Sequence, residues 1–224
     1  MGFNSVPPDI IAAYVIVLFF GIGIHEYAHC KVADMCGDPT PSFYGRVTLN
    51  LFKHFDAQGV IMMVMCAFFG IGIGGGKPAP CNPAKMGNPR WDGFATVLAG
   101  PLSNLAQAAI FALVFRLVGT QNGLPDFANK VILIGIIANL SMMLFNLIPF
   151  GPLDGHWLVG FLLPEKQRFH WFKINRAIGM LGLMIVVTVF NQIAMAGGPD
   201  VIGMIIYRPL MYFFKLLTGV SIEL

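Results

Sequence analysis

Three stretches of the chain, residues 93–115, 131–153 and 177–199, are apolar and contain no Asp, Glu, Lys or Arg. A helix needs about 20 residues to cross a hydrocarbon layer of about 30 Å, so each stretch is long enough to span a membrane. An earlier apolar segment, residues 10–24, reaches this length only if its helix continues to Cys30. These runs predict an all-α polytopic membrane protein in contact with the lipid bilayer.

Composition supports this class and excludes one kind of partner. Only 11% of the residues are charged, whereas a soluble domain carries roughly 25%. The net charge of +3 is too small and too scattered for a surface that binds nucleic acid, so we expect no nucleic-acid partner. The four cysteines, at positions 30, 36, 66 and 81, form no CxxC pair, and we expect free thiols.

The segment between the first two apolar helices differs in composition. Residues 38–56 alternate in polarity and are rich in Thr, Val, Phe and Tyr, which predicts one or two short strands. Residues 60–75 are apolar and lead into glycines and the sequence KPAPCNP, which favours a re-entrant helix that returns as an extended segment. A sixth full span is the alternative. We therefore expect five to six membrane segments, including a re-entrant hairpin at 60–76, with a small β element between the first two.

The chain is expected to form a single domain over residues 1–224. Its core would occupy about residues 10–160, and its C-terminal helices residues 171–224. The last apolar stretch, 201–217, is interrupted by an Arg-Pro pair, so we expect it to lie at the membrane interface or to insert only halfway.

Basic residues indicate the orientation of a membrane protein, because they accumulate on the cytoplasmic side. If Asn4 lies outside, ten of the fourteen basic residues fall on the inner side. These ten are Lys31, Arg46, Lys53, Lys77, Lys85, Arg90, Lys166, Arg168, Lys173 and Arg176. We therefore expect the N-terminus outside, and the histidine-rich end of the first helix and the active site nearer the cytoplasm.

The end of the first apolar helix contains His25-Glu26-Tyr27-Ala28-His29, an HExxH motif. Four residues advance a helix by about 400°, so the two histidines emerge one turn apart on one face and can bind one Zn²⁺ at about 2.0 Å. Glu26 lies to the side of this pair, where it can accept a proton from the water that the metal activates. The alternative is that these polar side chains are satisfied without a metal.

A catalytic zinc usually takes a third protein ligand, and Asp154 is the natural candidate. It is the only charged residue between positions 131 and 164. The surrounding sequence, NLIPFGPLDG at 146–155, contains two prolines and two glycines, which must interrupt the helix. Such a break inside a membrane is costly unless it lines a polar cavity. An ordinary proline kink with a snorkelling aspartate is the alternative.

Three motifs in order resemble the signatures of the site-2-protease family of intramembrane zinc metalloproteases: HEYAH at 25–29, AGPLSN at 99–104 and NLIPFGPLDG at 146–155. The resemblance covers about residues 20–160. The intervening GDPTPSFYGRVTLN, KPAP-CNP and NPR segments are similar to the short bacterial branch of that family, whose members lack a PDZ or CBS domain.

The resemblance implies a role for each matching residue. One zinc per chain would be bound by His25, His29 and Asp154. Glu26 would be the general base of catalysis. Asn146 would help to hold the scissile carbonyl or the oxyanion that forms from it.

Other polar residues of the region are given lesser roles. A strand at 46–50 would pair with an unwound substrate by β-augmentation, as the resemblance implies. We expect His54 and His156 to be solvated histidines at the interface, with an accessory role at the metal as the alternative. Asn104 is expected to bridge helices rather than to catalyse.

The expected function is that of a zinc endopeptidase that cleaves a protein substrate in or near its transmembrane helix. The protein would be a multi-pass integral protein of a bacterial cell membrane. The alternative is a non-proteolytic membrane protein, either a transporter or a pseudoprotease. The complete HExxH motif argues against a pseudoprotease, and a transporter would need acidic residues in several spans, where only two are present.

Overall fold

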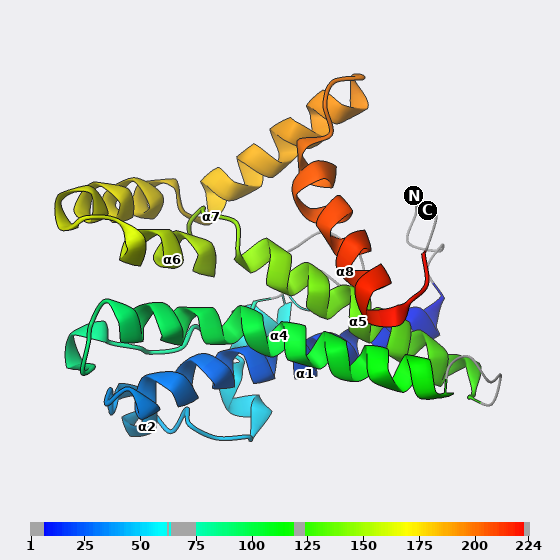
Figure 1. Cartoon of the computed structure of the whole chain (residues 1–224), viewed down its shortest axis with the longest axis horizontal. Coiled ribbons are helices and arrows are strands. Elements are labelled where there is room, and N and C mark those ends of the chain that lie inside the picture. The colour runs from blue at the N-terminus through cyan, green and yellow to red at the C-terminus, as the bar shows by residue number, and fades with distance from the viewer. Residues whose placement is uncertain (1–6, 62, 64–74, 119–123, 222–224) are drawn as a thin grey trace.

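The computed structural model describes residues 7–61, 63, 75–118 and 124–221. Three long helices form the body of the molecule (Figure 1): α1 (Pro8–Met35), α4 (Trp91–Val118) and α5 (Asp126–Asn146). Each of them is long and apolar enough to cross a membrane.

The first helix, α1, runs without interruption for 28 residues, which corresponds to about 42 Å. The prediction that the first apolar segment continues through the HExxH motif is therefore confirmed. Pro8 lies in its first turn, where a backbone N–H would have no acceptor within the helix, so proline costs no hydrogen bond there. Gly37, with φ 95°, follows its end. His25 and His29 consequently lie more than a turn inside a continuous helix.

The long helices pack through small and apolar side chains. α4 and α5 approach closely at Gly135, where an added Cβ would lie 2.6 Å from the Phe111 ring. Small residues permit such close contact between membrane helices. Buried apolar residues of α4 and α5 form one cluster, and a further helix, α8 (Arg208–Thr218), contributes Leu210 and Phe214 to it. This packing places α4 at the centre, in contact with α1, α5, α6 and α8.

No strand occurs in the described residues, so the prediction of a small β element at 38–56 is wrong. This segment contains two short helices, α2 (Thr40–Phe43) and the 3-10 helix η1 (Leu51–His54). The buried Asp38 carboxylate accepts hydrogen bonds from Thr40 and from the backbone N–H of Asn82. Burial alone would raise the pKa of Asp38, but these hydrogen bonds lower it. Side-chain hydrogen bonds to nearby backbone thus replace a strand ladder.

The prediction of five to six membrane segments is contradicted in part. Within the described residues three helices qualify as spans, or up to four if the two parts of α7 count as one bent span. α7 (Glu165–Met195) consists of Glu165–Gly179 and Leu181–Met195, which meet at 75°. The break lies at Gly179, whose φ of 55° is incompatible with a helix. The second part is only about 22 Å long, so a straight span at 177–199 does not form.

Two further predictions concern segments that are described only in part or without a membrane. The re-entrant hairpin predicted at 60–76 falls mostly on residues outside the described part of the chain. On either side of them, residues 57–61 are helical and residues 75–82 form no regular secondary structure. The stretch 201–217 is helical, because the π-helical turn η4 (Gly203–Tyr207) leads directly into α8. Its position relative to the membrane stays a prediction.

The short helix α6 (Asp154–Leu162) follows the proline-rich break after α5 that the sequence predicts. Arg90, just before α4, fixes the end of α6, because its guanidinium donates to Phe161 O at 2.7 Å and to Leu162 O at 2.8 Å. Cations near the last carbonyls stabilise a helix end. Gly93 brings the two helices into contact, since an added Cβ would lie 2.6 Å from the Phe161 ring.

Candidate metal centre

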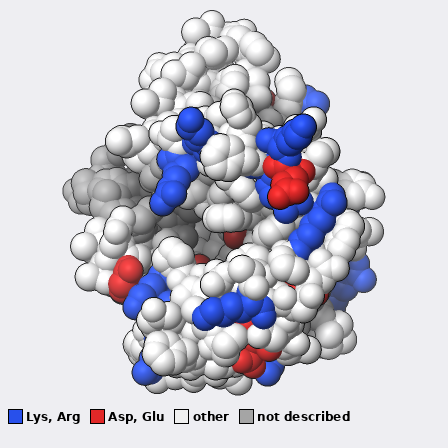
Figure 2. Space-filling view, turned by 90° about the vertical axis from the view of Figure 1, so that its left-hand side faces the viewer, with Lys and Arg blue, Asp and Glu red and all other residues white. Residues whose placement is uncertain are grey.

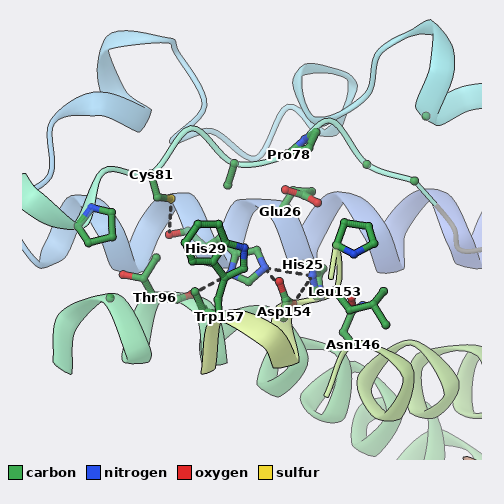
Figure 3. A pocket seen from close by; sticks show the side chains of 18 of the residues that line it. His25, Glu26, His29, Pro78, Cys81, Thr96, Asn146, Leu153, Asp154 and Trp157 are labelled. Carbon is green, nitrogen blue, oxygen red and sulfur yellow. Dashed lines mark hydrogen bonds and ion pairs between the residues drawn. The ribbon is translucent and has the colours of Figure 1, made fainter. Parts of the chain in front are cut away.

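His25 and His29 lie one turn apart on α1 and point to the same side (Figure 3). Both side chains are buried, although they are polar. Their Nε2 atoms are 3.1 Å apart, and their rings meet edge to face. The spacing of the HExxH motif therefore produces the paired imidazoles that it predicts.

Asp154 faces the two histidines from the first residue of α6. Its Oδ2 lies 3.2 Å from His25 Nε2 and 3.4 Å from His29 Nε2. This oxygen is buried, and within the described structure it accepts no hydrogen bond from another group. Gly155 lets the preceding turn close tightly, because an added Cβ would lie 2.3 Å from Ile148 O. The fold thus brings the carboxylate of Asp154 to a histidine pair that is far from it in the sequence.

The imidazoles are oriented by groups on α4. Asn104 Oδ1 lies 2.7 Å from His25 Nδ1, and Thr96 O lies 2.8 Å from His29 Nδ1. The Asn104 amide is itself fixed, because its Nδ2 donates to Asn139 Oδ1 on α5 at 3.1 Å. Both Nδ1 atoms therefore donate, and both Nε2 atoms present lone pairs toward the carboxylate. Asn104 bridges helices as predicted, but its contact with His25 was not predicted.

These side chains fit a zinc ion. His25, His29 and Asp154 each offer one ligand atom, and these atoms lie within 4.8 Å of one another. Two imidazoles and a carboxylate match the number and type of ligands at catalytic zinc. Burying two facing lone pairs and a carboxylate oxygen without a hydrogen bond is costly unless a cation satisfies them.

Gly100 provides the space that the imidazoles occupy beside α4. An added Cβ at this position would lie 2.3 Å from His29 Nε2 and 2.7 Å from His25 Cε1. Only a hydrogen atom fits there. The AGPLSN motif contains this glycine, yet its spacing alone does not indicate which element Gly100 would face.

Glu26 lies beside the histidines, on the side of the irregular segment 75–82 (Figure 3). Its side chain touches Gly76, where an added Cβ would lie 2.7 Å from Glu26 Cγ. Its Oε2 is buried and has no hydrogen-bond partner among the described residues. This oxygen is therefore free to accept a proton or a hydrogen bond from a molecule in the cavity.

Arg46 fixes the irregular segment 75–82 beside the site. The buried guanidinium donates to Lys77 O at 2.6 Å, and the Lys77 N–H donates to His54 O at 2.8 Å. The strand predicted at 46–50 does not form, and Arg46 anchors a loop instead. The prediction that His54 and His156 are solvated is also wrong, since both are buried. Burial lowers the pKa of His54, which favours its neutral form.

The side chains of the candidate metal centre line a cavity of about 470 Å³. It is lined by Glu26, the three candidate ligands and Asn146, among others. Asn146 lies at the end of α5, and its Nδ2 donates to Met142 O at 3.0 Å, so one amide hydrogen remains for another acceptor. Figure 2 shows the molecule hollowed at the end where α6 and the start of α4 lie, with acidic side chains inside the hollow and Lys and Arg around it.

Three of the four cysteines are described, and all three are free thiols, as predicted; Cys66 lies outside the described residues. Cys81 lines the cavity. Burial raises the pKa of the Cys81 thiol to about 12, so this side chain stays protonated at neutral pH.

The sequence is similar to those of known proteins. The sequence profile of peptidase family M50 matches residues 13–133. Three relatives carry the name "Putative zinc metalloprotease". YwhC of Bacillus subtilis is 36% identical over 171 residues, which cover 72% of this chain and 74% of YwhC. The protein sll0528 of Synechocystis sp. is 38% identical over 116 residues, 45% of this chain and 29% of its own length. Rip2 of Mycolicibacterium smegmatis is 28% identical over 173 residues, which cover 72% of this chain and 63% of Rip2. No solved structure is significantly similar to the chain.

Proposed function

Because the chain belongs to peptidase family M50, the site-2-protease family, we propose that it is a metalloprotease that hydrolyses peptide bonds in or near a transmembrane helix of its substrate. Its cofactor is zinc, because the names of the relatives include this metal and because the buried His25, His29 and Asp154 suit it. Its long apolar helices make it a membrane protein. Cleavage inside the membrane, and the substrate itself, belong to the proposal.

One observation carries the proposal: two histidines, an aspartate and a glutamate converge in a single cavity between apolar helices. Ionisable groups at such a place are expensive and are usually functional. His25, His29 and Asp154 would hold the zinc. When bound, zinc acts as a Lewis acid that lowers the pKa of water and polarises a carbonyl group.

The side chains of the cavity supply the proton transfers and the positioning. Glu26 accepts a proton from the attacking water and later donates it to the leaving amine, so the proton ends on nitrogen. Asn104 and Thr96 keep the imidazole Nδ1 atoms hydrogen-bonded throughout. Asn146 donates an amide N–H to the carbonyl oxygen of the substrate as that oxygen gains negative charge.

The cavity is proposed to open toward the cytoplasm of a bacterial cell. The hollow end of the molecule carries Lys and Arg around its rim (Figure 2), and basic residues favour the cytoplasmic side. The N-terminal end of α1 lies at the other end of the molecule (Figure 1). Water for hydrolysis would therefore reach the site from the cytoplasm.

The rival function is a metal-binding membrane protein without proteolysis. It is less well supported, because Glu26 is placed beside the ligands with a buried oxygen that has no partner among the described residues. A purely structural or transporting metal site has no use for such a base.

Comparative membrane proteomics tests the proposal. Cells would produce the wild type, Glu26→Gln or Glu165→Gln, the last being an exposed acid at the start of α7. Truncated fragments of membrane proteins should vanish with Glu26→Gln and persist with Glu165→Gln, while all three proteins retain zinc. Identical fragments in all three cell lines would contradict proteolysis.

The role of Asn146 has its own test. Asn146→Ala should bind zinc normally, while single-turnover cleavage falls about 10²- to 10³-fold, as for the loss of one oxyanion donor. Rates are divided by bound zinc to correct for misfolded protein. A rate within a few-fold of the wild type would leave Asn146 with only its hydrogen bond to Met142 O.

A further inference from the structure

One wall of the cavity, leading away from the metal centre, is aromatic. Asp154, Trp157 and Phe161 are three and seven residues apart on α6, so they share one face of this helix. All three line the cavity. Trp157 lies beside the metal centre (Figure 3) and is nevertheless 42% exposed. Phe172 supports its ring from behind, with 4.7 Å between the ring centroids. The indole is thus held in place with part of its surface open to the cavity.

The facing wall belongs to α4. Gly93, Thr96 and Val97 line the cavity and lie on the same face of α4 as Gly100, which touches the histidines. Between Gly100 and Gly93 the helix rises about 10 Å. Phe161 packs against Gly93 and marks the far end of this groove. Its length is enough for about three residues of an extended peptide.

The polar atoms of Thr96, on the α4 wall of this groove, are already engaged. Thr96 O accepts the hydrogen bond of His29, and Thr96 Oγ1 contacts Met86 Sδ at 3.9 Å. Asp56 and Gln58, by contrast, line the part of the cavity near the glycines of residues 75–76. A polar side chain placed against this wall would lose water without gaining a partner from Thr96. An apolar side chain would be removed from water at no such cost.

We propose that the groove between α4 and α6 is a subsite that accepts a large apolar side chain adjacent to the scissile bond. This proposal rests on the proposed peptidase function and adds a substrate class to it. Val97 on α4 and Trp157 on α6, which both line the cavity, determine the size of the side chain. The preferred substrates carry a residue such as Leu or Phe, rather than Ala or Asp, on one side of the cleaved bond.

The test uses the purified protein in detergent and a synthetic transmembrane peptide, selected from a mixture because the wild type cleaves it. Mass spectrometry locates the cleaved bond, and each flanking residue is replaced in turn by Leu, Phe, Ala or Asp. On one side of the bond, kcat/KM for Leu or Phe should exceed that for Ala or Asp by about 10- to 200-fold. Rates are divided by the amount of bound zinc.

Three variants connect this preference to the groove. Trp157→Ala should reduce the ratio to a few-fold, because the subsite loses one wall. Val97→Phe should narrow the groove and favour Ala over Phe, a change in the opposite direction that does not depend on Trp157. Trp91→Ala serves as the matched control, since Trp91 is exposed and does not line the cavity; it should retain the wild-type ratio.

The possible failures are distinguishable. Cleavage with equal kcat/KM for all four residues on both sides would overturn the subsite and leave the peptidase function intact. A wild-type preference that survives in both groove variants would do the same. If the wild type cleaves no peptide of the mixture that Glu26→Gln leaves whole, the peptidase function and the subsite are both overturned.

Discussion

Replacing Gly100 by alanine is expected to remove zinc binding while α4 stays folded. The new Cβ would lie 2.3 Å from His29 Nε2, 2.4 Å from His29 Cε1 and 2.7 Å from His25 Cε1. Ordinary contact begins at 3.4 Å, so the His29 ring must move by about 1.1 Å. The contacted atoms belong to buried rings whose Nδ1 atoms are held by hydrogen bonds, so the displacement falls on the Nε2 positions.

The energies separate folding from metal binding. Alanine favours a helix over glycine by about 1 kcal/mol, whereas overpacking costs about 1–3 kcal/mol. The net loss of about 2 kcal/mol or less leaves most domains folded. Metal coordination tolerates only about 0.2 Å of error in ligand distances. We therefore expect the zinc affinity of Gly100→Ala to fall at least about 100-fold, or about 2.8 kcal/mol.

The assay is equilibrium dialysis of detergent-solubilised protein against buffers of fixed free zinc, with helicity measured by circular dichroism. Gly87→Ala is the matched control, because its added Cβ would meet only Asp92 Oδ2, at 3.5 Å; it should bind zinc as the wild type does. A Gly100→Ala protein with wild-type helicity and wild-type zinc affinity would refute the reasoning.

Three other predictions concern the supports of the site. Asn104→Ala should lower zinc affinity about 10- to 100-fold, because the buried His25 Nδ1 loses its acceptor; dialysis against buffered zinc measures this, and an unchanged affinity would contradict the role. Arg90→Gln should lower zinc affinity about tenfold through loosening of α6, whereas loss of helicity without any effect on zinc would point to a role in folding only. Asp38 has a lowered pKa, so its stabilisation is complete above about pH 4 and is lost as the pH falls through the native pKa. The difference in melting temperature between the wild type and Asp38→Asn should accordingly shrink below about pH 4, and a difference independent of pH would exclude this linkage.

The elements that could be predicted from the sequence depend on local spacing or on isolated charge. The HExxH spacing predicts the position of His25 and His29 on one helix face, and the lone charge in a long apolar stretch identifies Asp154. Thr96 could not be identified, because it acts through its backbone carbonyl, which every residue possesses. The sequence indicates that the Asn104 side chain needs a hydrogen-bond partner on another helix, but it does not indicate that this partner is a histidine.

The wrong predictions arose where tertiary contacts override a local pattern. Residues 38–56 alternate in polarity like a strand, yet hydrogen bonds to the Asp38 carboxylate fold part of them into turns. Gly179 lies in an apolar stretch with other glycines, and its sequence does not indicate which one takes a positive φ. A histidine next to a lysine looks solvated, but His54 is buried beside the loop that Arg46 anchors.

The candidate metal ligands are separated by roughly 125 residues of chain, between His29 and Asp154. During synthesis, which proceeds from the N-terminus, the histidine pair is made first and remains without its carboxylate until α6 has been made and has docked on α4. Zinc binding at full affinity is therefore a late event in biogenesis, and it reports that the bundle has been assembled. Newly made or truncated chains that end before residue 154 would carry an intact HExxH motif without the carboxylate that completes the candidate metal centre.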